Sequence, residues 1–144
     1  MFRKIAVAYN ESPEAEHALV CAVQLAKDMG AELSTITVAT ELPAYTAFAA
    51  AADPALPQVL AEDREKSYAA LEGKVRAFAQ PHGVDVRSHI VDGREVEAIV
   101  SFLRREKTDL LVIGLHQRTP YLARLWSTVY ELAQEAPCSV LGVH

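Results

Sequence analysis

The chain has 144 residues, of which 51% are hydrophobic and 23% are charged, so disordered, collagen-like and low-complexity classes are excluded. This length predicts a single domain over residues 1–144. The formal net charge of −5 argues against nucleic acid as a partner, because binding phosphates requires clustered lysine and arginine. No apolar run approaches the roughly 20 residues that a membrane helix needs, so we expect a soluble, cytoplasmic protein without a membrane partner.

Residue types that bind metals are scattered along the chain. Cys21 and Cys138 are the only cysteines, and they fit no zinc-binding spacing. Both lie among apolar neighbours, so we expect small buried hydrophobes, and the alternative is a redox sensor. The five histidines also lack metal-site spacing, and the sequence therefore predicts no metal centre.

The first elements are a strand, a helix and a second strand. Residues 4–9 form a largely apolar run, as expected of a central parallel strand covered on both faces. Ser12 then supplies a hydroxyl N-cap, and Pro13 occupies the first helical position. Helical spacing of apolar residues continues to Gly30, which ends the helix, and residues 33–39 form the second strand.

The rest of the chain continues this alternation. Residues 40–57 contain three prolines and predict a long connection, a kind of segment that is often functional. Three helical patterns and three strand-like runs follow. The helical patterns cover residues 60–78, 96–103 and 122–136, and the strands cover residues 84–91, 109–114 and 139–143.

This order of elements predicts a three-layer α/β/α sandwich around a five-stranded, mostly parallel sheet, a Rossmann-like architecture. The two most apolar strands, residues 4–9 and 109–114, belong in the middle, which gives the strand order 3-2-1-4-5. Ligands of open α/β sheets bind where the strand order reverses, at the carboxyl ends of the strands. We therefore expect one crevice between residues 10–12 and 114–119.

Three stretches of the sequence resemble the universal stress protein family. They are Lys4-Ile5-Ala6-Val7-Ala8 with Asn10-Glu11-Ser12, Asp109-Leu110-Leu111-Val112-Ile113-Gly114, and Ala136-Pro137-Cys138-Ser139-Val140-Leu141. They are similar to the family's first strand with its Asp-Gly-Ser turn, its fourth strand ending in Gly, and its last strand, Ala-Pro-Cys-Pro-Val-Leu. The resemblance covers essentially the whole chain and implies the family's adenine nucleotide alpha hydrolase-like fold.

The glycine motif of this family is degenerate in the chain. Nucleotide-binding members carry Gly, two residues, Gly, nine residues, then Gly-Ser or Gly-Thr. This spacing falls on Gly114, Gln117 and the pair Ser127-Thr128, so two of the three glycines are replaced. A side chain at Gln117 disfavours the backbone conformations that approach phosphate, and Pro120 removes an amide donor.

The start of the following helix retains part of a phosphate site. Thr128 and Glu131 fit a capping box. The resemblance implies that the amides of Thr128 and Val129 receive an anion, and Arg118 would offset its charge. The alternatives are an ordinary helix cap and a solvated loop cation.

On the opposite side of the crevice, the resemblance implies ligand contacts by Asn10, Ser12 and the backbone of Val38. Asn10 stands where the family has an acidic residue and can hydrogen-bond a ribose or an adenine edge. Glu11 stands where the family has Gly, and we expect its carboxylate near the phosphates, which it would repel. Val38 is equally consistent with an ordinary strand residue.

These residues lead to three functional hypotheses. We expect a non-enzymatic stress-response protein that acts as a homodimeric binding module, without tight ATP binding and with no required cofactor. The alternative is an adenine-nucleotide sensor that binds AMP or ATP through a modified phosphate loop. A weak ATP hydrolase, with His116 in an acid–base role, is a third hypothesis.

The last strand is an edge of the predicted sheet, so its outer backbone groups invite pairing with another chain. Members of the family commonly dimerise through this strand, and we predict a homodimer through residues 138–143. Tyr121 and Trp126 either pack on the sheet or anchor a partner protein.

Overall fold

The structure is a computed structural model that describes residues 1–39, 45–115 and 128–144, except for the side chains of residues 45–47. Five strands form one parallel sheet in the order β3-β2-β1-β4-β5, which confirms the predicted order. The strands are β1 (Lys4–Ala8), β2 (Glu32–Ala39), β3 (Val86–Asp92), β4 (Leu110–Gly114) and β5 (Ser139–Val143). The helices are α1 (Pro13–Met29), α2 (Tyr45–Ala52), α3 (Leu56–Ala79), the short 3-10 helix η1 (Gln80–His82), α4 (Glu95–Glu106) and α5 (Thr128–Glu135).

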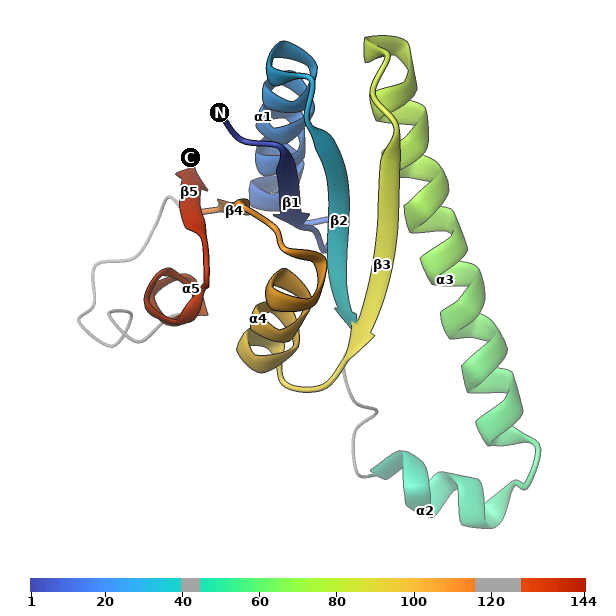
Figure 1. The fold of residues 1–144 in the computed structure, drawn as a ribbon. Coiled ribbons are helices and arrows are strands. Elements are labelled where there is room, and N and C mark those ends of the chain that lie inside the picture. Colours follow the sequence, from blue (N-terminus) through green and yellow to red (C-terminus); the bar gives the residue numbers. More distant parts are fainter. Residues whose placement is uncertain (40–44, 116–127) are drawn as a thin grey trace.

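Helices cover both faces of the sheet (Figure 1). On one face, α1 and α3 bury a core that includes Leu19 and Val75. On the other face, α4 and α5 bury a second core that includes Leu103 and Leu132. The predicted three-layer α/β/α sandwich is therefore confirmed.

The central strands β1 and β4 pair in parallel, with Ile5 opposite Leu110. Both strands are buried at their apolar positions, as their continuous hydrophobic runs predict. Asp109, just before β4, adds a side-chain contact to β1. Its Oδ2 accepts a hydrogen bond from the amide of Arg3 at 2.8 Å, and its Oδ1 accepts one from the amide of Lys4 at 3.1 Å.

Helix α1 begins and ends where its sequence predicts. The Ser12 hydroxyl oxygen accepts a hydrogen bond from the amide of Ala15 at 3.2 Å, and Pro13 is the first helical residue. Gly30 follows the helix with a left-handed backbone, φ +62°. This capping fixes the angle at which the chain leaves β1 and enters the helix.

The prediction of a long connection over residues 40–57 is wrong for most of its length. Residues Tyr45–Ala52 form α2, and α3 already begins at Leu56. The alanine-rich run favours a helix because alanine has the highest helix propensity. Pro57 lies in the first turn of α3, where its missing amide removes no hydrogen bond.

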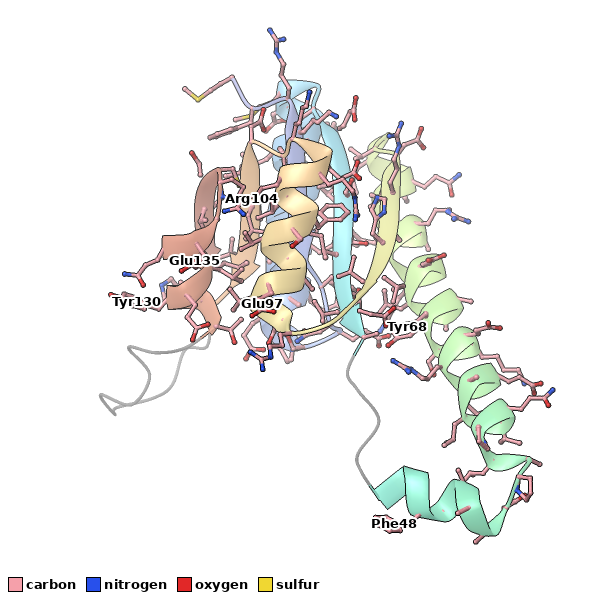
Figure 2. The ribbon with its side chains drawn as sticks, turned by 60° about the horizontal axis from the view of Figure 1, so that its bottom comes forward. Phe48, Tyr68, Glu97, Arg104, Tyr130 and Glu135 are labelled. Atoms are coloured by element: carbon pink, nitrogen blue, oxygen red, sulfur yellow. The ribbon has the colours of Figure 1, made fainter. Side chains whose placement is uncertain are left out.

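Helix α2 and the start of α3 form an arm that extends beyond the sheet (Figure 1). Phe48 lies on α2 at the end of this arm, and its side chain is 81% exposed (Figure 2). The arm therefore lies apart from the crevice expected at the ends of β1 and β4.

Two other boundaries differ from the sequence prediction or cannot be compared with it. The third strand covers residues Val86–Asp92, two positions later at its start than predicted. Residues 116–127, which include most of the 114–119 side of the expected crevice and the first part of the predicted last helix, lie outside the described residues. In the part of the chain that the structure describes, no helix has the length and apolarity needed to span a bilayer.

Candidate functional site

The candidate site lies at the carboxyl ends of β1 and β4, which are neighbours in the sheet. After β1 the chain enters α1 on one face, whereas α5, the helix that follows β4, packs on the other face. This is the switch point at which open α/β sheets bind ligands. Of the predicted site residues, the described ones are Asn10, Ser12, Val38, Gly114, Thr128 and Val129. Arg118 and Ser127 lie outside the described residues, as do His116, Gln117, Pro120, Tyr121 and Trp126.

The loop that follows β1 is held by hydrogen bonds on both sides. The amide of Tyr9 donates to the carbonyl of Ile36 at 3.0 Å, and the Thr37 hydroxyl donates to the carbonyl of Tyr9 at 2.8 Å. One residue later, Asn10 Oδ1 accepts a hydrogen bond from the amide of Ser12 at 3.1 Å. This side-chain turn fixes the Asn10 amide group at the mouth of the crevice.

Glu11 has a left-handed backbone, with φ +61°. This conformation favours glycine, which explains why the family's pattern has Gly at this position. Glu11 Oε2 lies 3.4 Å from Lys74 Nζ on α3. The carboxylate that we expected beside the phosphates therefore pairs with a helix on the α1/α3 face of the sheet.

Lys74 also lies near a second acidic residue. Its Nζ is 3.9 Å from Glu16 Oε1, which accepts a 2.7 Å hydrogen bond from the Tyr9 hydroxyl. Burial of Tyr9 and the adjacent Glu16 carboxylate raise the pKa of the Tyr9 hydroxyl well above its usual value. Tyr9 therefore stays neutral and acts as a hydrogen-bond donor in this cluster.

Gly114 ends β4 against the first turn of α1. A Cβ atom at this position would overlap the backbone carbonyl of Glu14. Close packing of the strand on the helix therefore accounts for this glycine, whether or not a phosphate also approaches it.

At the far side of the crevice, Thr128 lies in the first described turn of α5. Its hydroxyl donates to Glu95 Oε2 at 3.4 Å, so it faces a carboxylate of α4. Glu131 adds a second acidic residue in the first turn of α5. A helix N-terminus attracts anions, and here the chain supplies its own negative groups.

Sequence reasoning did not identify Glu95 or Lys74 as neighbours of the crevice. Glu95 opens the helix that follows β3, a position where acidic residues are common for capping reasons alone. Lys74 lies in the middle of α3, 63 positions after Glu11. Only the packing of these helices on the sheet brings the two residues to the site.

Metal ligation and cysteine chemistry find little support in the described residues. No group of three His, Cys, Asp or Glu side chains within residues 1–39, 45–115 and 128–144 is arranged to hold a metal ion. Cys21 and Cys138 are half-buried free thiols. Burial raises the pKa of the Cys138 thiol, which lowers its reactivity.

The sequence matches the model of the Universal stress protein family over residues 1–144. It is similar to Universal stress protein MJ0531 of Methanocaldococcus jannaschii, with 26% identity over 99% of this chain and 82% of the relative. Among solved structures it is similar to UspA from Lactobacillus plantarum, with a TM-score of 0.74, 23% identity, and coverage of 99% of this chain and 98% of that chain. A protein of the same family from Burkholderia pseudomallei gives a TM-score of 0.73, 25% identity, and coverage of 99% and 96%.

These matches agree with the order of the strands in the sheet. The chain therefore belongs to the universal stress protein family.

Proposed function

We propose that this universal stress protein is a non-enzymatic, cytoplasmic binding module of the stress response, and that its crevice does not hold ATP tightly. The observation that carries the proposal is the contact between Thr128 and Glu95 at the first turn of α5. A triphosphate at this helix would meet the Glu95 carboxylate, and the two like charges repel each other.

The side of the crevice next to β1 and β2 carries the other residues that the resemblance implies as ligand contacts. Asn10 is exposed there, and Val38 is half-buried near the end of β2. Solved structures similar to this chain include a universal stress protein in complex with cAMP, one from Archaeoglobus fulgidus in complex with dAMP, and one from Arabidopsis thaliana with AMP bound. These ligands support the second candidate function, the binding of a purine ligand, here one that carries one phosphate or none.

Titration of the purified chain with ATP–Mg²⁺, AMP and adenosine by calorimetry tests the proposal. We expect affinity to fall as phosphates are added, because each brings negative charge toward Glu95. In Glu95→Gln, the affinity for AMP and ATP should rise about fivefold, the effect of removing about 1 kcal/mol of repulsion.

Glu97→Gln is the matched control for charge. Glu97 lies two positions further along the same first turn, where it pairs with Arg94 at 3.7 Å. We expect no comparable gain in this variant. A wild-type chain that binds ATP–Mg²⁺ more tightly than AMP would contradict the proposal.

We also propose that the chain is a homodimer paired through β5. This strand is an outer strand of the sheet and leaves Leu141 36% exposed. Such an edge offers unpaired backbone donors and acceptors to a second chain.

A further inference from the structure

The amino edge of the sheet, at the opposite end of the strands from the crevice, carries a cluster of basic side chains. Strand β1 begins at this edge with Lys4, and α4 ends there with Lys107 as its C-cap. In Figure 2, Arg104 lies toward this end of α4 and Glu97 toward the end near the crevice. We call the cluster the basic patch, and it consists of the exposed residues Arg3, Lys4, Arg104, Arg105 and Lys107.

Two distant parts of the chain form the basic patch. Lys4 Nζ donates to the carbonyl of Glu106 at 3.2 Å, a contact between residues 102 positions apart. Asp109 joins the same two parts, since its carboxylate accepts hydrogen bonds from the amides of Arg3 and Lys4. The patch therefore exists only in the folded chain and is not visible as a run of basic residues in the sequence.

The acidic side chains within the basic patch already have partners. Asp109 is half-buried, and both of its carboxylate oxygens accept from backbone amides. Glu106 is also half-buried, and its Oε1 accepts a 3.1 Å hydrogen bond from Arg105 Nε. Glu32, which lies opposite Lys4 in the sheet, is an exposed acidic residue at the border of the patch.

Three of the basic side chains keep an uncompensated charge. Within residues 1–39, 45–115 and 128–144, no ion pair is formed by Arg3, Arg104 or Lys107. The macrodipole of α4 favours Arg104 in its last turn, but Arg3 precedes β1 and does not belong to that helix. Helix capping alone therefore does not account for the patch.

We propose that the basic patch binds an acidic segment of a partner protein. Three of its five residues are arginines, whose planar guanidinium groups can each bind a carboxylate through two parallel hydrogen bonds. The chain as a whole has a net charge of −5, so the patch is a local reversal of sign. An acidic partner is attracted here and repelled elsewhere, which favours a short acidic segment over an extended acidic surface.

The surroundings of the patch favour a polypeptide over a nucleic acid. A duplex carries phosphates along its whole length and would also meet the acidic remainder of the chain. Single strands are held by aromatic side chains on which their bases stack, and residues 1–4 and 104–109 expose none. The patch lies at the other edge of the sheet from the crevice, so this binding is independent of any purine ligand.

Fluorescence anisotropy with labelled synthetic probes tests the proposal. The first probe is a peptide of alternating glutamate and serine, and the second is the same peptide with glutamine in place of glutamate. We expect the purified chain to bind the glutamate peptide and not the glutamine peptide. The affinity should fall as salt is added, because the contacts are exposed charge pairs.

The double variant Arg104→Gln, Lys107→Gln removes two charges of the patch. Its affinity for the glutamate peptide should be about fivefold lower, the effect of losing two exposed charge pairs. The matched control is Lys66→Gln, Arg76→Gln, which removes two exposed charges of α3, on the other face of the sheet. It has the same net charge as the patch variant and should bind like the wild type. Circular dichroism melts establish that both variants are folded.

Four results would overturn the inference. The first is no binding of the glutamate peptide, and the second is an equal loss of affinity in the two double variants, which would show an effect of net charge only. The third is tighter binding of a labelled thymidine oligonucleotide than of the peptide. The fourth is a loss of self-association in the patch variant alone, which would make a second copy the occupant. None of these measurements involves the crevice, so AMP titration still tests the proposed function separately.

Discussion

Glu11 holds a left-handed backbone in the loop that shapes the crevice, with φ +61°. This conformation costs a non-glycine residue about 1–2 kcal/mol. The ion pair between Glu11 and Lys74 offsets little of this strain, because both side chains are partly exposed and such pairs contribute at most about 1 kcal/mol. The residue thus carries strain at the mouth of the site.

We predict that Glu11→Gly raises the free energy of unfolding by about 1 kcal/mol, measured by urea denaturation. Lys107, which ends α4 with φ +54°, is a comparable position, and Lys107→Gly should act in the same direction. Lys74→Ala removes the ion pair without changing the backbone and should lower stability only slightly. A destabilised Glu11→Gly variant would mean that the ion pair outweighs the backbone strain.

The residues of the site were predictable where the chain enters or leaves a central strand. Asn10, Ser12 and Gly114 follow or end buried strands, so the parallel sheet brings them to one edge. Glu95 and Lys74 were not predictable, because their sequence positions indicate only ordinary helical residues. Their contacts depend on how α3 and α4 rotate as they pack on the sheet.

Helix α1 and strand β4 meet at Gly114 without room for a side chain. The contact places the first turn of α1 directly against the end of β4.

We predict that Gly114→Ala lowers the free energy of unfolding by several kcal/mol, because the new methyl group meets the backbone of Glu14. Backbone atoms cannot rotate out of the way as a flexible side chain can. Gly73→Ala is the matched control. Gly73 lies inside α3 with open space around it, so alanine there should raise stability by about 0.5–1 kcal/mol through helix propensity. Equal effects in the two variants, measured by thermal melts, would contradict the close packing at Gly114.

The bounds of a helix were predictable from the sequence where cap residues, proline or glycine mark its ends. Helix α1 has an N-cap, a proline and a terminal glycine, and its bounds follow from Ser12 and Gly30. Helix α2 has no regular alternation of polar and apolar positions to mark it. The prolines on either side of it indicate a connection, whereas the high helix propensity of its alanines favours the helix.

At the scale of the whole molecule, the two outer strands differ. Strand β3 lies between α3 and α4, which both contact it (Figure 1). Strand β5 is short, carries no charged residue, and has Leu141 exposed. The Leu115 side chain packs over Gly142 on one face of this strand.

We predict that Leu141→Lys weakens dimerisation about tenfold or more, because two like charges would meet across a symmetric pair of β5 strands. Analytical ultracentrifugation over a concentration series measures the change. Val59→Lys is the control, since Val59 is 49% exposed on α3, far along the chain from β5. A wild-type chain that stays monomeric at high concentration, or equal behaviour of the two variants, would exclude this interface.

The pairing of β1 with β4 has a consequence for how the protein is made. Asp109 reaches back to the amides of Arg3 and Lys4, contacts between residues 106 and 105 positions apart. On the ribosome, β2 can join β1 early, but the other side of β1 waits until residue 110 and its successors have left the exit tunnel. For most of translation the nascent chain thus exposes an apolar strand edge, the kind of surface that molecular chaperones bind.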